Sequence, residues 1–188
     1  AGAGLLEVSN VVSGDTLVLG GSMNLAGKDA GSQTVSTIAG VTLSNSNYTV
    51  TGATASGTVL VTPRALSVNA ASGATRRYDG SVHAATGLLS LGGVLAGDSA
   101  SLSGNAVLAS KNVGAQAISG LGTLSLDNAN YTLNGVLPAG SVAITALPVN
   151  VAAIGGAQKE YDGSVAAGAE LLEVSNVVSG DTLVLGGS

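Results

Sequence analysis

Residues 5–22 read LLEVSNVVSGDTLVLGGS, and residues 171–188 repeat the same letters. The start positions of the two copies differ by 171 − 5 = 166, which is twice 83. A third, diverged copy begins midway between them, at Leu88, and reads LLSLGGVLAGDSASLSGN. A fixed spacing of this kind is the sequence signature of a tandem array, in which every unit contains the same supersecondary elements.

The spacing of 83 residues from Leu5 to Leu88 defines one repeat. The alignment at this spacing continues along the chain without a gap. Residues 5–62 align with residues 88–145, and residues 63–87 align with residues 146–170. A unit of this length falls within the size range of one small domain. The expected parts are residues 1–62 as the C-terminal part of a first module, residues 63–145 as a complete module, and residues 146–188 as the N-terminal part of a third.

The two ends of the chain allow two forms of assembly. We expect both ends to continue covalently into further units of a longer array. In the alternative, residues 146–170 of one chain complete residues 1–62 of the next, which gives a head-to-tail assembly by strand complementation.

The composition indicates a structural protein. The chain has 29 Gly, no Cys, no Trp, no Phe and a single His, and only 9% of its residues are charged. A net charge of −5 with six basic residues argues against a nucleic-acid partner. Because no apolar run approaches the length of a membrane span, we expect no membrane insertion.

Short segments that alternate between apolar and polar residues predict β-strands. Gly-Gly, Ser-Gly-Asp, Asp-Gly and Asn-x-Asn clusters between them predict turns. We therefore predict an all-β fold of tandem β-sandwich-like modules of about 83 residues in an extended array, with β-grasp-like modules or a continuous β-solenoid as alternatives. The clearest predicted strands are residues 58–62, 123–126, 131–133, 141–145 and 147–151.

Three recurring motifs predict defined local geometry. Asp-Gly in the YDG motif suits a tight turn with positive φ, and the preceding Tyr is predicted to close the edge of the core. The Lys-Asn-Val-Gly motif predicts a turn leading into a strand, and Asn-Tyr-Thr predicts an Asn turn followed by a strand. The residues assigned to these motifs are Tyr78, Asp79, Gly80, Lys111, Gly114, Asn130, Tyr131, Tyr161, Asp162 and Gly163.

The order of these motifs carries a family resemblance. A basic residue before YDG, a Gly-Asp turn, KNVG, NYT and a closing strand that ends in Ile-Thr follow one another in the chain. This ordered set resembles the YDG-type tandem repeats of large bacterial surface exoproteins, such as filamentous-haemagglutinin-like adhesins. The first unit departs from the pattern because it reads KDAG at residues 28–31. The resemblance implies a secreted or surface-displayed stalk, often exported by two-partner secretion, with a role in adhesion, aggregation or biofilm.

Catalytic and metal chemistry finds little support in the residues. His83 aligns with Ala166, so a His-based dyad cannot recur in each unit, and without Cys there is no thiol nucleophile. No loop carries the spacing of a calcium, zinc or phosphate site. We expect no enzyme activity, no catalytic or cofactor-binding residues, no metal ligands and no cofactor, and we leave calcium at the junctions between modules open.

Two covalent modifications fit the motifs. Asn47 and Asn130 each begin an Asn-Tyr-Thr sequence, which matches the N-glycosylation acceptor pattern, although a turn followed by a core Tyr explains the same letters. Lys111 with Asn128 or Asn130 supplies the atoms of an intramolecular Lys–Asn crosslink. Both modifications are left open.

The expected function is that of a non-enzymatic, extracellular repeat of a bacterial adhesin or surface filament, serving as a stalk or fibre body. The alternative is a module that recognises glycans or other copies of itself. Expected partners are neighbouring repeats of the same protein, other copies in a filament, and a glycan or cell-surface ligand.

Overall fold

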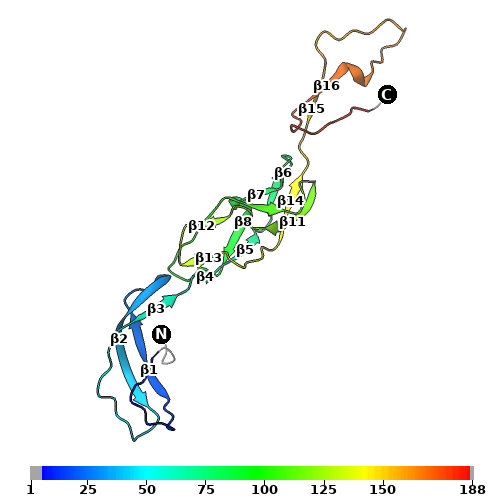
Figure 1. Cartoon of the computed structure of the whole chain (residues 1–188). Helices are drawn as coiled ribbons and strands as arrows, with labels where there is room; N and C mark the ends of the chain where they lie inside the picture. The colour runs from blue at the N-terminus through cyan, green and yellow to red at the C-terminus, as the bar shows by residue number, and fades with distance from the viewer. Residues whose placement is uncertain (1–5, 187–188) are drawn as a thin grey trace. The chain divides into compact units, whose positions relative to one another are not determined.

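The structure, a computed structural model, describes residues 6–186 and consists almost entirely of β-strands and turns (Figure 1). The prediction of an all-β fold class is confirmed. Within residues 6–186 the helical elements are two 3-10 turns, η2 (Thr86–Leu88) and η3 (Ala169–Leu171). No helix in this range has the length and apolar character needed to cross a membrane.

Chain contacts divide the protein into two compact units, and each is described by itself. Among the described residues, the first unit contains residues 6–65 and Asn128–Thr132, and the second contains Leu66–Asp127 and residues 133–186. The segment Asn128–Thr132 therefore joins the first unit although it lies far from it in sequence.

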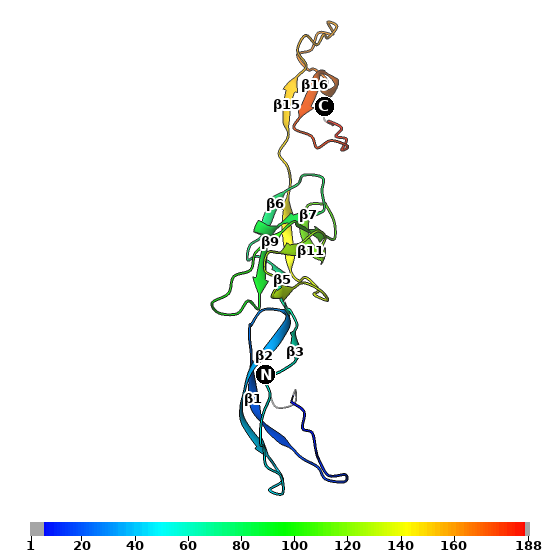
Figure 2. The same cartoon turned by 60° about the vertical axis from the view of Figure 1, so that its left-hand side comes forward.

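The first unit is built on a three-stranded antiparallel sheet (Figure 2). Its strands are β1 (Leu19–Leu25), β2 (Gly31–Leu43) and β3 (Thr58–Val61), in the order β1-β2-β3. Two short strands, β4 (Arg64–Ala65) and β13 (Tyr131–Thr132), pair in parallel. The pair explains why the segment around Tyr131 belongs with this unit.

The second unit holds the remaining strands in one larger sheet and three ribbons. The sheet has the order β6-β14-β11-β10-β7, and the ribbons are β5-β8, β9-β12 and β15-β16. The strands are β5 (Ser67–Ala70), β6 (Thr75–Arg77), β7 (His83–Ala85), β8 (Leu89–Gly92), β9 (Leu102–Ser103), β10 (Asn105–Leu108), β11 (Gly114–Gly120), β12 (Ser125–Leu126), β14 (Ser141–Thr145), β15 (Asn150–Ala153) and β16 (Leu172–Ser175).

Strand β14 lies in the interior of the five-stranded sheet. It pairs in parallel with β6 and antiparallel with β11, and the other pairs in this sheet are antiparallel. The successive coils of a solenoid stack in parallel, whereas most strand pairs within residues 6–186 are antiparallel. The sheet is therefore a mixed sheet of separate strands and not a stack of coils.

The strand pairs recur in step with the repeat of the sequence. Leu25 faces Val35 across β1 and β2, and one repeat later Leu108 faces Ile118 across β10 and β11. The pairs β2-β3 and β11-β14 also share one register, as do β5-β8 and β15-β16. Since register decides which side chains face the core, equivalent residues face the same side of each sheet.

Gly104 lies between β9 and β10, where the chain approaches the segment around Thr123 too closely for a side chain. A Cβ atom at this position would lie 2.3 Å from the carbonyl oxygen of Thr123, and its φ of +87° is unfavourable for other residues. Gly21 takes the equivalent position in β1, at a register shift in the β1-β2 pair. The glycine thus allows an irregularity that bends the long hairpin.

The apolar core is concentrated in residues 66–145. The side chains of Leu66, Val68, Leu108 and Val142 are at most 2% exposed, and they come from both the β5-β8 ribbon and the large sheet. Each buried residue of this kind contributes about 1.5–3 kcal/mol of stability. The first unit, in contrast, has Met23 and Tyr131 as its buried apolar residues among those described.

Truncation of Leu108 should cost far more stability than truncation of its counterpart Leu25. Leu108 is 2% exposed, whereas Leu25 is only half-buried. We expect Leu108→Ala to lower the free energy of unfolding by about 2–5 kcal/mol, since it leaves a cavity. Leu25→Ala serves as the matched control with a smaller loss. Urea unfolding combined with hydrogen exchange of residues 114–120 measures both, and equal losses would contradict this placement of the core.

Candidate functional site

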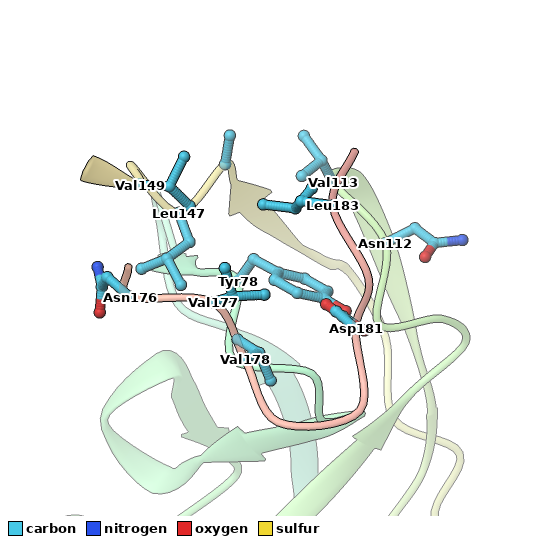
Figure 3. Close-up of a pocket in the computed structure, with 11 residues that line it drawn as sticks. Tyr78, Asn112, Val113, Leu147, Val149, Asn176, Val177, Val178, Asp181 and Leu183 are labelled. Carbon is cyan, nitrogen blue, oxygen red and sulfur yellow. The ribbon is translucent and has the colours of Figure 1, made fainter. Parts of the chain in front are cut away.

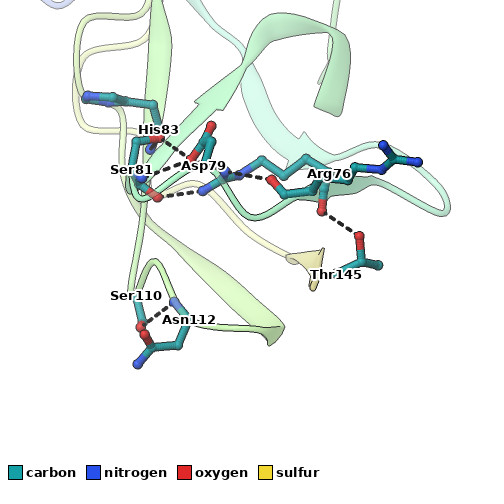
Figure 4. A network of polar contacts seen from close by, with 8 residues as sticks. Arg76, Asp79, Ser81, His83, Ser110, Asn112 and Thr145 are labelled. Carbon is teal, nitrogen blue, oxygen red and sulfur yellow. Dashed lines mark hydrogen bonds and ion pairs between the residues drawn. The ribbon is translucent and has the colours of Figure 1, made fainter. Parts of the chain in front are cut away.

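The YDG motif forms a closed turn around the carboxylate of Asp79 (Figure 4). This carboxylate accepts hydrogen bonds from the backbone N–H and the hydroxyl of Ser81, both at 2.8 Å. Gly80 has a φ of +77°, as the turn requires. The positive φ predicted for the Asp-Gly pair is present, and Gly163 repeats it with a φ of +73°.

Arg76 secures the same turn from the preceding strand β6. Its guanidinium forms an ion pair with the Asp79 carboxylate, and its Nη2 donates a 2.6 Å hydrogen bond to the carbonyl of Ser81. Only 11% of the Arg76 side chain is exposed, and its buried Nε has no hydrogen-bond partner among the described residues. The side chain therefore acts as a clamp across the turn.

These contacts change the ionisation of Asp79. Desolvation raises the pKa of its carboxyl, but the hydrogen bonds from Ser81 and the charge of Arg76 outweigh that effect. The pKa of Asp79 is consequently lower than its ordinary value. The turn thus favours the ionised form of the carboxyl.

The same clamp recurs one repeat later with Lys in place of Arg. The Lys159 ammonium lies 2.6 Å from the Asp162 carboxylate and donates a 3.0 Å hydrogen bond to the carbonyl of Ser164. The hydrogen bond from Lys159 and that from the Ser164 N–H lower the pKa of Asp162. Arg76 and Lys159 therefore make equivalent contacts, since each bridges the Asp carboxylate and the Ser carbonyl of its own YDG turn.

Tyr78 and Tyr161 have different surroundings. Tyr78 is half-buried and lines a pocket of about 260 Å³, whereas Tyr161 is 94% exposed. The prediction that the Tyr of this motif closes the core edge does not describe Tyr161, because no described strand lies beside residues 158–160. The corresponding residues 75–77 form β6 and pair with β14.

The Tyr78 pocket is lined mainly by apolar side chains from several segments (Figure 3). Leu147 and Val149 follow β14, Val113 comes from the Lys-Asn-Val-Gly turn, and Val178 and Leu183 follow β16. Val178 packs closely on the YDG turn, since a Cβ atom on Gly80 would lie 2.7 Å from its Cγ1. The pocket is therefore lined by residues that precede β14 in the sequence and by residues that follow it.

One ion pair borders this pocket. Lys111 Nζ lies 3.6 Å from the Asp181 carboxylate and 6.0 Å from the centre of the Tyr78 ring. The pKa of Lys111 is raised, first by hydrogen bonding to Tyr78 and then by the nearby charge of Asp181. Exposed pairs of this kind contribute little stability, so the apolar contacts dominate here.

Asn130 holds a backbone segment of the first unit. Its side-chain Nδ2 donates a 2.8 Å hydrogen bond to the Asp29 carboxylate, and its Oδ1 accepts one from the N–H of Ala30 at 2.6 Å. Glycosylation of Asn130 would use the nitrogen that donates to Asp29, whereas Asn47 is exposed. Glycosylation at either residue stays a prediction.

The Asn-Tyr-Thr tyrosines differ in burial. Tyr131 is 5% exposed, whereas Tyr48 is half-buried and donates a hydrogen bond from its hydroxyl to the Asp15 carboxylate. That hydrogen bond is the main reason why the pKa of Tyr48 is raised. The hydroxyl also accepts a 3.0 Å hydrogen bond from the N–H of Val12. Tyr48 thus joins the segment that follows β2 to the turn at residues 12–15.

The Lys-Asn-Val-Gly motif and its counterpart in the first unit supply turn-forming contacts. Gly114, with a φ of +118°, begins β11, and Gln116 of that strand donates a hydrogen bond to the carbonyl of Asn112. Gln33 makes the equivalent bond to the carbonyl of Asp29. Across the described part of the chain, no group of three or more His, Cys, Asp or Glu residues is placed to hold a metal ion.

The pairing of Lys111 with Asp181 was missed by the sequence interpretation. The sequence contained a signal for this contact. Lys28 and Asp98 lie one repeat before Lys111 and Asp181, so a Lys and an Asp have the same separation in both repeats. The contact between Asn130 and Asp29 had no such signal, since its equivalent one repeat later falls outside this sequence.

Comparison with known families finds one match: residues 62–138 match the YDG domain. The chain thus contains a YDG domain, and its sheet extends beyond the matched range because β14 pairs with both β6 and β11. Comparison with curated proteins and with solved structures gives no match.

Substitutions of Arg76 should show whether the contacts across the YDG turn need only a positive charge or the guanidinium group itself. We expect Arg76→Lys to change the free energy of unfolding by less than about 1 kcal/mol, since Lys159 makes the equivalent contacts. Arg76→Ala should cost about 1–3 kcal/mol, because it leaves the Ser81 carbonyl and the Asp79 carboxylate without their partner. Urea unfolding at neutral pH measures both, and a loss for Lys as large as that for Ala would contradict the proposed clamp.

The ionised Asp79 should stabilise the fold only above acid pH. Because its folded-state pKa is lowered, its contribution is present above the unfolded value and is lost as the pH falls through the folded pKa. We expect Asp79→Asn to lower the free energy of unfolding by up to about 1 kcal/mol at neutral pH, since the Asp79 side chain is 56% exposed although Arg76 is largely buried. The difference from wild type should shrink below pH 3.8, and a difference that persists there would refute an electrostatic origin.

Proposed function

We propose that the chain is a non-enzymatic structural segment of an extracellular bacterial adhesin or surface filament, where repeated β-modules form a stalk or fibre body. The observation that carries this proposal is the recurrence of the same strand registers and the same Asp-centred turns one repeat apart. A catalytic site usually occurs once in a chain, whereas elements that support structure recur in every unit of an array.

The connection between residues 68–78 and residues 139–145 supports a role in bearing tension. Backbone hydrogen bonds join residues 68–78 to residues 139–145, among them Ala139 to Val68 at 3.0 Å, Ala70 to Ala139 at 2.9 Å, Ala143 to Ala74 at 2.9 Å and Tyr78 to Thr145 at 2.8 Å. The strands concerned run parallel. Tension between residues 66 and 146 would therefore act along the strands, so that these hydrogen bonds resist it together.

The proposed location and adhesive role rest on the ordered motifs. The basic residue before YDG, the Gly-Asp turn, the Lys-Asn-Val-Gly turn and Asn-Tyr-Thr occur in the order found in repeats of large surface exoproteins. The YDG domain at residues 62–138 is consistent with that resemblance. The partners we propose are neighbouring repeats and other copies of the same protein.

Labelling of intact source cells tests the proposal. Antibodies raised against residues 62–138 should bind cells that have not been permeabilised, and electron microscopy should show the label along projecting fibres. A second antibody, against a cytoplasmic protein, serves as the control for leakage. Label that appears only after permeabilisation would refute the extracellular stalk.

A glycan array tests the alternative of a carbohydrate-binding module. The stalk proposal expects no saturable glycan binding by the chain. Strong binding of one glycan that Tyr161→Ala abolishes would instead favour recognition by the exposed aromatic ring, because Tyr161 is 94% exposed. Tyr48→Ala is the control, since that ring is half-buried in the first unit.

A further inference from the structure

The turns at residues 28–31 and 111–114, the Lys-x-x-Gly turns, share their geometry although their letters differ. The glycines that end them have φ values of +122° and +118°. In each turn a Gln of the following strand donates a hydrogen bond to the carbonyl of the second residue, at 2.9 Å for Gln33 and 3.0 Å for Gln116. The two turns therefore present equivalent groups one repeat apart.

The first of these turns is contacted by a residue of the next repeat. Residues 63–145 make up that repeat and contain most of the buried apolar side chains. Asn130 donates a 2.8 Å hydrogen bond to the Asp29 carboxylate and accepts a 2.6 Å bond from the N–H of Ala30. Its own N–H donates to the side-chain oxygen of Asn128, which fixes the position of Asn130.

The second of these turns is contacted by a loop of the repeat that follows it. This loop is residues 176–183, and its Val178 lines one pocket together with Val113 of the turn (Figure 3). Lys111 of the same turn forms the 3.6 Å ion pair with Asp181 of the loop. The Lys-x-x-Gly turn therefore meets the following repeat in both of its copies.

The YDG turn of residues 63–145 extends this second contact. A Cβ atom on Gly80 would lie 2.7 Å from Cγ1 and 3.9 Å from Cβ of Val178. Tyr78 lines the same pocket, and Lys111 Nζ lies 6.0 Å from the centre of its ring. Gly80 thus leaves the space that Val178 occupies, in addition to supplying the positive φ of the turn.

The Gly-Asp turn in the docked loop has the same conformation in all three copies of the repeat. The N–H groups of Asp15, Asp98 and Asp181 each donate a 3.0 Å hydrogen bond to the carbonyl three residues earlier. The glycines before them have φ values between +89° and +98°. A turn that keeps its shape in different surroundings loses little conformational entropy when it docks.

We propose that the YDG turn and the Lys-x-x-Gly turn of one repeat form the surface that binds the next repeat of the chain. The next repeat binds to it through its Gly-Asp turn and the Asn of its Asn-Tyr-Thr segment. The Gly-Asp turn supplies apolar contact through Val178, and Asn130 supplies hydrogen bonds of fixed direction. The recurring motifs are thus the contact surfaces between successive repeats.

The partner of this surface needs an apolar residue three positions before the Asp of its Gly-Asp turn. The three copies of the repeat have Val12, Leu95 and Val178 at this position, and all three residues are apolar. The inference rests on the part of the proposed function that makes neighbouring repeats partners, and it does not depend on an extracellular location. Cell labelling tests the location and the experiments below test the contact, so each can fail without the other.

A disulfide between the YDG turn and the Gly-Asp turn tests the apolar contact, since the chain has no Cys of its own. In Gly80→Cys/Val178→Cys the two Cβ atoms would lie 3.9 Å apart, which suits a disulfide. Gly163→Cys/Val178→Cys is the matched control, because Gly163 has almost the same φ in the same motif. No atom of residues 6–186 lies within 4 Å of a Cβ atom at Gly163 apart from its chain neighbours.

We expect the Gly80 variant to form its intramolecular disulfide under mild oxidation at least about tenfold faster than the control, because only its geometry fits. Loop closure alone would favour the control, whose two cysteines are closer in the sequence. Equal rates, or crosslinks only between different chains, would overturn the proposed surface. Hydrogen exchange of residues 141–145 checks that β14 stays folded in both variants.

Asn130→Asp tests the hydrogen-bonded contact at the first turn. The substitution removes the donor to Asp29 and places two carboxylates side by side, so the amide of Ala30 should exchange its hydrogen about tenfold faster at neutral pH. Nuclear magnetic resonance measures this rate in the full chain. Asn47→Asp makes the same change in the other Asn-Tyr-Thr sequence, where the Asn is exposed, and should leave the rate unchanged.

A second substitution distinguishes this contact from a general loss of structure. Asp29→Asn/Asn130→Asp exchanges the amide and the carboxylate, so a donor again faces an acceptor, and slow exchange of the Ala30 amide should return. The position of Asp29 accepts Asn, since Asn112 occupies it one repeat later. Exchange in the double variant as fast as in Asn130→Asp, or an equal effect of Asn47→Asp, would refute the role of Asn130.

Discussion

The pairing of β14 with both β6 and β11 is the constraint on which the second unit depends. It brings β6, near the beginning of the YDG domain, beside β14, which follows the matched range, and it places β14 in the interior of the sheet. Val142 and Ile144 on β14 and Val68 and Leu89 on the β5-β8 ribbon are all buried, so both elements contribute to the core. In the first unit, β3 pairs with β2 among the described strands, and Val59 and Val61 of β3 are half-buried.

The sequence predicted local structure well where turn chemistry and alternation decide it. The strands expected at residues 58–62 and 141–145 correspond to β3 and β14, and the Asp-Gly turns at Gly80 and Gly163 have the expected positive φ. These features depend on neighbours within a few residues. A strand expected from residue 147 begins only at Asn150, because its start is set by the partner strand β16.

Contacts between segments that are far apart in the sequence could not be predicted from these local patterns. The two YDG motifs have the same letters, but Tyr78 is half-buried and Tyr161 is exposed. This difference depends on whether segments equivalent to those that follow β14 and β16 lie beside the tyrosine ring. The clamp on the YDG turn shows the reverse case. Arg76 and Lys159 differ in chemistry, yet both bridge a carboxylate and a carbonyl, so the function of the position is kept while its residue changes.

The interior position of β14 also governs the order in which a module can form. β14 comprises Ser141–Thr145 and is the last strand of the five-stranded sheet to leave the ribosome. Until it emerges, β6 and β11 have no common partner, and the sheet remains in two pieces. The five-stranded sheet therefore stays open while the chain is made from N- to C-terminus, and it closes in one late step.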